Sequence, residues 1–266
     1  MSFCADCIKG VKHEGTPSGT LTKIGGVDCY VATPKGDYDK GKVVLFLPDV
    51  FGLQLQNNQL ALAFFINPIA DRDVDQLLTD DFANNGFKTV LLDYLSGDPM
   101  PPDAFTTPGF NIGEWFGKHP LPTIREPTDK VIAALKEEGV TKFGATGYCL
   151  GGRFVFDLAF DGVISVAVTA HPSLLKSPDD LERYAKEAKA PLLINSCTND
   201  EQFPLEAQAK ADEILGGGKF APGYVREYFE GNTHGFAVRG DLSDPKVKAA
   251  KEGAFEKSVA WFQKYL

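Results

Sequence analysis

The stretch with the clearest chemical potential runs from residue 142 to 160, KFGATGYCLGGRFVFDLAF. A strand-like segment leads into the turn G-Y-C-L-G, residues 147–151, and a helix-like segment follows directly. This order is typical of a nucleophile elbow, whose sharp turn presents the central side chain above the carboxyl edge of a sheet. Glycines flank such a turn because a Cβ there would collide with a neighbouring strand or helix. A helix N-terminus favours the thiolate, so Cys149 is the predicted nucleophile; the alternative is a buried cysteine that packs like a small apolar residue.

A nucleophilic thiol needs a base, and the base needs an acid that orients it. The chain has four histidines, and only His234 follows the thiol with an acid between them and lies after the last strand-like segment, as in α/β-hydrolases. His234 is therefore the predicted base, against the alternative of a solvated loop histidine, and His171 is the reserve. Asp200, just past the strand-like segment 190–197, is the predicted acid. Glu201 competes with it, and a carboxylate that only interacts with a helix dipole is the alternative.

The oxyanion hole of such a site needs two backbone N–H groups. The residue after the nucleophile supplies one, and the loop after an earlier strand supplies the other. These positions correspond to Leu150 and to Val50 in LFLPDVFGLQ. Two donors aimed at the developing charge typically contribute several kcal/mol between them.

Elements that could position these residues alternate along the chain. Strand-like segments rich in Val, Ile, Leu and aromatic residues cover 27–33, 42–48, 87–94, 141–147, 163–170, 190–197 and 223–230. Helix-like segments cover 129–139, 204–218 and 244–265. Most of the strands are apolar throughout, which is typical of strands covered on both faces. We therefore expect a single α/β domain over 1–266, with a mostly parallel sheet and helices on both faces.

The composition excludes several functions. With 266 residues, 43% of them hydrophobic, the chain can bury a sizeable core. A net charge of −9 disfavours nucleic acid and anionic membrane surfaces as partners. With no evident secretory signal or spanning apolar run, we expect a cytoplasmic protein. Five cysteines do not make a disulfide framework. Cys4 and Cys7, with only His13 nearby, lack the ligands of a zinc site, so we expect an extended tail over 1–20 and no metal or cofactor.

Four segments, LPDVFG, GYCLGGR, TNDEQFP and GNTHGFAVRG, together resemble the dienelactone hydrolase family of α/β-hydrolases in kind and order. The opening HEGTPSGTLTKIGGVDCYVATP resembles its fungal branch, and the similarity runs from about His13 to the end of the chain. The resemblance implies a triad of Cys149, Asp200 and His234. It also implies metal-free hydrolysis of an enol-lactone or of other small esters and lactones.

The resemblance further implies three substrate-binding positions. The family often binds the substrate carboxylate with arginine, and Arg239 is the position carried over; a surface salt bridge is the alternative. Bacterial members place a glutamate near the cysteine, where this chain has the shorter Asp49. Tyr94 and Ser96 stand where a second bacterial arginine is expected, so strict dienelactone specificity is not expected.

Residues 60–76 are an insertion relative to the family pattern, either a lid or a translated intron. If they displaced Val50, catalysis would fail. The leading hypothesis is hydrolysis of a small ester or lactone, with or without a carboxylate, through an acyl-thioester on Cys149. A thiol sensor and a carboxylate-binding protein remain alternatives, and the chain is expected to be a monomer or a small homo-oligomer.

Overall fold

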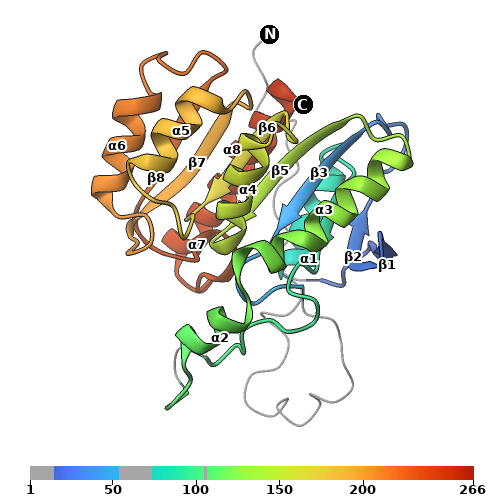
Figure 1. The fold of residues 1–266 in the computed structure, drawn as a ribbon, viewed down its shortest axis with the longest axis horizontal. Coiled ribbons are helices and arrows are strands. Elements are labelled where there is room, and N and C mark those ends of the chain that lie inside the picture. Colours follow the sequence, from blue (N-terminus) through green and yellow to red (C-terminus); the bar gives the residue numbers. More distant parts are fainter. Residues whose placement is uncertain (1–14, 54–73, 105–106) are drawn as a thin grey trace.

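One mostly parallel sheet forms the centre of the molecule (Figure 1). The structure is a computed structural model that describes residues 15–53, 74–104 and 107–266. Its strands are β1 Thr20–Ile24, β2 Val27–Ala32, β3 Lys42–Leu47, β4 Thr89–Leu92, β5 Lys142–Tyr148, β6 Val166–Ala170, β7 Leu192–Asn199 and β8 Tyr224–Thr233. They are ordered β1-β2-β4-β3-β5-β6-β7-β8. β2 runs antiparallel to β1 and β4, and the neighbours from β4 to β8 are parallel. The seven predicted strands are confirmed, and β1 was not predicted.

Helices cover both faces of this sheet. The helices are α1 Val74–Asn84, α2 Ile112–Lys118, α3 Leu121–Glu137, α4 Leu150–Phe160, α5 Asp179–Glu187, α6 Leu205–Leu215, α7 Phe236–Arg239 and α8 Pro245–Tyr265. One core packs the sheet against α3, α4, α5 and α6, and the other packs it against α1, α7 and α8. Within β3, Val43 and Leu45 face the first core, whereas Val44 and Phe46 face the second. Burial of both faces explains the continuous apolar runs of the central strands.

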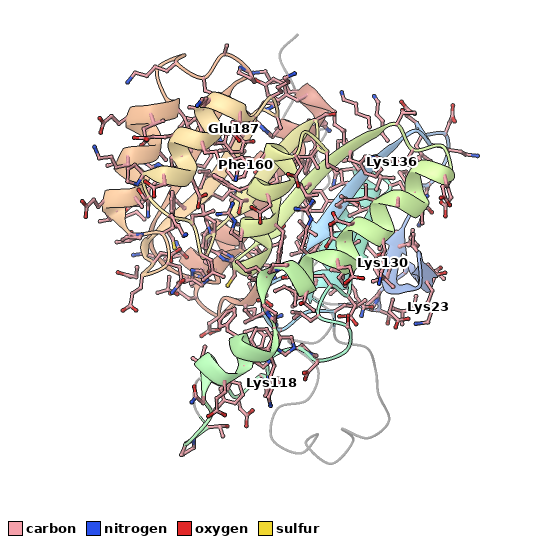
Figure 2. The ribbon with its side chains drawn as sticks, viewed as in Figure 1. Lys23, Lys118, Lys130, Lys136, Phe160 and Glu187 are labelled. Atoms are coloured by element: carbon pink, nitrogen blue, oxygen red, sulfur yellow. The ribbon has the colours of Figure 1, made fainter. Side chains whose placement is uncertain are left out.

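The predicted helices form, although one begins earlier than its pattern indicated. α3 starts at Leu121 rather than at residue 129, and Pro127 lies inside it. Along α3, Lys130 and Lys136 point away from the sheet (Figure 2), whereas Val131 and Leu135 are buried. Among the described helices, none is both long enough and apolar enough to cross a membrane.

The two segments that departed from the α/β pattern lie largely outside the described residues. Of the expected tail over 1–20, the described end is tied to the fold: the backbone N–H of Ser18 donates to Asp80 (2.6 Å), and that of Gly19 donates to the Tyr30 hydroxyl (2.5 Å). Of the expected insertion over 60–76, residues 60–73 are not described. Residues 74–76 form the first turn of α1 and are buried, so they are part of the folded body.

Candidate active site

Cys149 occupies the sharp turn between β5 and α4. Its φ of 50° and ψ of −114° are unusual for a residue with a side chain, and such strained backbone is often found at active sites. The flanking glycines are required by space: a Cβ on Gly151 would lie 2.0 Å from the Leu47 carbonyl oxygen, and a Cβ on Gly147 would lie 2.4 Å from that of Gly151. The turn therefore has the close packing that was predicted for it.

The turn after β6 holds Cys149 from the other side. The Cys149 N–H donates to the Ala170 carbonyl (3.3 Å), and the Ser173 N–H donates to the Cys149 carbonyl (2.9 Å). In addition, Cys149 Sγ lies 3.1 Å from the hydroxyl oxygen of Ser173. Ser173 was not among the predicted site residues; its only signal in the sequence is its position just past the end of a predicted strand, in TAHPS.

His234 follows the end of β8 and is bonded to Asp200. Its N–H donates to the carbonyl of Asn199 (3.0 Å), and its Nδ1 lies 2.9 Å from Asp200 Oδ1. The same carboxylate oxygen accepts from the N–H groups of Gln202 (2.9 Å) and Phe203 (3.1 Å). Burial raises the pKa of Asp200, but these hydrogen bonds and the charge of His234 outweigh burial and lower it. Glu201, the competing acid, is exposed to solvent, and His234 contacts Asp200.

The imidazole of His234 has its pKa raised to about 10. Burial opposes its protonation, but interactions with Asp200 and Cys149 outweigh that effect. Its Nε2 is buried and has no hydrogen-bond partner within the described part of the chain, although Cys149 contributes to the raised pKa of the ring. These interactions therefore favour the positively charged imidazolium over the neutral ring.

His171 packs against His234 without sharing its chemistry. The two ring centroids lie 4.9 Å apart in an edge-to-face arrangement. His171 is fully buried, and burial, followed by the charge of His234, lowers its pKa to about 3. A ring that stays neutral down to such low pH is a poor base at neutral pH, which argues against the reserve role.

The two expected oxyanion donors lie at the ends of neighbouring strands. Leu150 is the first residue of α4, where an N–H has no acceptor within its own helix. Val50 lies in the loop after β3, hereafter the oxyanion loop (residues 48–52). This loop is held by hydrogen bonds from Phe51 N–H to Asp49 Oδ1 (2.9 Å) and from Met100 N–H to the Val50 carbonyl (2.9 Å). Neither bond uses the N–H of Val50.

The three expected substrate-binding residues contact one another or the oxyanion loop. Arg239 donates two hydrogen bonds to the Asp49 carboxylate, from Nε to Oδ2 at 2.5 Å and from Nη2 to Oδ1 at 3.0 Å. Its guanidinium also lies 4.6 Å above the Phe51 ring. The two side chains are only 17% and 5% exposed, so this is not a surface salt bridge. Tyr94 is buried, and its hydroxyl donates to the Pro48 carbonyl. Asp49 is thus bonded to Arg239, whereas the thiol lies against Ser173.

The described residues contain no cluster of three or more His, Cys, Asp or Glu side chains placed to share a metal ion.

The parallel sheet, the elbow after β5, the acid after β7 and the histidine after β8 define an α/β-hydrolase fold. Solved structures with this fold include a putative dienelactone hydrolase from Klebsiella pneumoniae, with a TM-score of 0.65 at 17% identity; it covers 93% of this chain and 98% of its own.

The family follows from the sequence comparisons. The model of the dienelactone hydrolase family matches residues 70–266. "Hydrolase pyvD" of Aspergillus violaceofuscus is 36% identical, covering 98% of this chain and 96% of the relative. "Dienlactone hydrolase 1" of Gibberella moniliformis is 32% identical, covering 98% and 93%. The chain belongs to the dienelactone hydrolase family.

Proposed function

We propose that this protein hydrolyses small esters or lactones through a covalent thioester on Cys149. The observation that carries the proposal is the imidazole of His234, which is bonded to buried Asp200 and interacts with the thiol on the elbow. A histidine oriented by an acid beside a nucleophile is the arrangement that acyl transfer needs.

The protons balance through one cycle. With His234 protonated, Cys149 reacts as the thiolate and adds to the ester or lactone carbonyl. When the carbon–oxygen bond breaks, His234 gives its proton to the leaving oxygen, and an acyl-thioester remains. Neutral His234 then takes a proton from water as the water oxygen adds to the thioester carbonyl. Loss of the sulfur as thiolate releases the acid and restores the starting pair.

The oxyanion of each addition step is assigned to the N–H groups of Leu150 and Val50. Support for Val50 comes from the bonds that fix its loop: the Asp49 side chain accepts from Phe51, and Tyr94 donates to Pro48. In this proposal Tyr94 positions the loop and does not contact the substrate.

The substrate class is proposed from chemistry and from the names of relatives. A thiolate suits esters, lactones and thioesters, whose leaving groups depart more readily than an amine does. The relatives called "Dienlactone hydrolase 1" and "Carboxymethylenebutenolidase homolog" support a lactone or ester. A carboxylate on the substrate would have to share Arg239 with Asp49, which already occupies two of its donors.

The test compares purified wild type with Cys149→Ala and Cys149→Ser, using p-nitrophenyl acetate and a small lactone. We expect a burst of p-nitrophenol, an acetylated peptide containing Cys149 in the wild type, and loss of both in Cys149→Ala. Equal rates for wild type and Cys149→Ala would overturn the proposal. A reactive thiol without turnover would instead favour a sensor. A sensor usually needs a second reactive thiol that forms a disulfide with the first. The other described cysteines do not suit that role, because burial raises the pKa of Cys29 and of Cys197 to about 12.

A further inference from the structure

We propose that Ser173 is a further catalytic residue: its hydroxyl donates a hydrogen bond to the sulfur of Cys149 when that sulfur is an anion. The inference rests on the proposed function, because it assigns a partner to the sulfur that the function requires as a thiolate. The sequence pattern gave Ser173 no role.

The hydroxyl of Ser173 lies close to the sulfur of Cys149 and is shielded from water. The Ser173 oxygen lies 3.1 Å from Cys149 Sγ. The serine is only 4% exposed, so bulk water competes little for either atom. A hydrogen bond to a charged group is stronger than one between neutral groups, and more so where water is excluded.

The turn that carries Ser173 is held rigidly by hydrogen bonds and by packing. Ser173 N–H donates to the Cys149 carbonyl (2.9 Å), and His171 N–H donates to the Asn195 carbonyl (2.9 Å). Pro172 restricts the backbone between them. The start of α4 packs so closely on this turn that a Cβ on Gly152 would lie 2.7 Å from Pro172 Cβ. The hydroxyl is therefore held beside the sulfur by backbone bonds on both sides.

The hydrogen bond between Ser173 and Cys149 has only one possible direction when the sulfur is an anion. A thiolate has no hydrogen to give, so beside it the rotatable hydroxyl must act as donor. A neutral thiol is a weak donor and a weak acceptor, so the same contact is worth less in that state. The contact therefore favours the anion over the thiol. It weakens when the sulfur is acylated and is restored when the sulfur leaves as thiolate, so it assists the release of the sulfur at the end of the cycle.

Other groups also act on this sulfur. His234 presents a positive ring, and the N-terminus of α4 adds a partial positive charge. The pKa of the buried Tyr94 hydroxyl is raised, first by burial and then by its interactions with Asp49 and Cys149. Ser173 is the neutral donor in this set, so its removal changes the stability of the thiolate without changing any formal charge.

The experiment measures how fast iodoacetamide alkylates Cys149 as a function of pH, with the site assigned by mass spectrometry. In Ser173→Ala we expect the curve to move to higher pH. At pH values below the ionisation of Cys149, the alkylation rate should fall about 10-fold, the value of one hydrogen bond to a charge, and the rates should converge at high pH. The matched control is Ser258→Ala, which removes another buried hydroxyl, one that donates to the Ala254 carbonyl and accepts from the Asn195 side chain. It should leave the curve unchanged.

Two further variants keep the test decisive if Ser173→Ala folds poorly. Ser173→Gly also deletes the hydroxyl and should shift the curve, whereas Ser173→Thr keeps the donor and should restore the wild-type curve. Superimposable curves for wild type and a folded deletion variant would overturn the role of Ser173. Alkylation needs no ester turnover, so this result stands even if the wild type hydrolyses no ester, which would overturn only the proposed function.

Discussion

The ion pair between Asp49 and Arg239 gives the sharpest prediction about how the oxyanion loop is held. It joins the loop after β3 to the end of α7, 190 residues away in sequence. The two hydrogen bonds are 2.5 and 3.0 Å long, and the carboxylate side chain is only 5% exposed. Arg239→Met would leave this carboxylate buried without its cation, whereas Asp49→Asn would keep an acceptor for the Phe51 N–H.

The magnitudes follow from these differences. Removing one partner of a buried pair typically costs 3–5 kcal/mol, and the 17% exposure of Arg239 places its replacement near the lower end, at about 3 kcal/mol. Asp49→Asn should cost about 2 kcal/mol, because Arg239 keeps its contact with the Phe51 ring and lies 3.8 Å from Asp75. The double variant should lose less than the sum, which gives a coupling energy of about 2 kcal/mol.

The assay is urea unfolding of the wild type, the two single variants and the double variant, combined with ester hydrolysis. Because the pair holds the loop that carries Val50, each single variant should also lower kcat about 10-fold, part of the value of one oxyanion donor. The control cycle uses Lys23→Met and Asp28→Asn, whose exposed ion pair on the outer strands (Lys23 in Figure 2) should show a coupling of about 0.5 kcal/mol. An Asp49–Arg239 coupling no larger than the control, together with unchanged kcat, would refute the reasoning.

For His234, a folded-state pKa of about 10 against an ordinary 6.5 means that its contribution to stability is present below pH 6.5 and is lost as the pH rises through about 10. His234→Gln should therefore flatten the fall of unfolding free energy over this range, and the wild type should lose ester turnover toward pH 10; a stability profile identical to wild type would contradict this. Gly151→Ala should destabilise the fold by about 4 kcal/mol because its Cβ meets a β3 carbonyl at 2.0 Å, whereas Gly117→Ala, with open space, should not; equal melting temperatures would count against the packing argument. Tyr94→Phe should cost about 1–2 kcal/mol and lower kcat more than it changes KM, because a carbonyl of the oxyanion loop loses its donor; unchanged kcat would remove Tyr94 from the positioning role.

Much of this fold could be read from the sequence because periodicity and burial agree along it. The apolar runs of the central strands have two buried faces, which is the pattern that predicted them. β1 was not predicted, because most of its residues are exposed and no apolar run marks it in the sequence. The early start of α3 escaped because Pro120, Pro122 and Pro127 suggest a loop, although a proline near a helix start is tolerated.

The candidate site was less readable, and the reason is distance in sequence. Chain order indicated which histidine and acid belong together, and the structure places Asp200 against His234. Nothing in the local sequence of Asp49 indicates that Arg239 will occupy both of its oxygens. Equally, a serine after a strand is common, and only the packing of the β6 turn against α4 brings Ser173 to the sulfur.

These two contacts are physically connected. A carboxylate directly beside a thiolate would repel it. Here Asp49 is held by Arg239 and by the N–H of Phe51. The neighbour of the thiol is instead a neutral hydroxyl, which can donate to the anion without opposing its charge. The raised pKa of His234 is consistent with this arrangement, because Asp200 and Cys149 both favour the protonated imidazole and together outweigh its burial. A hydroxyl beside the sulfur thus favours the anionic form of the nucleophile that the proposed reaction requires.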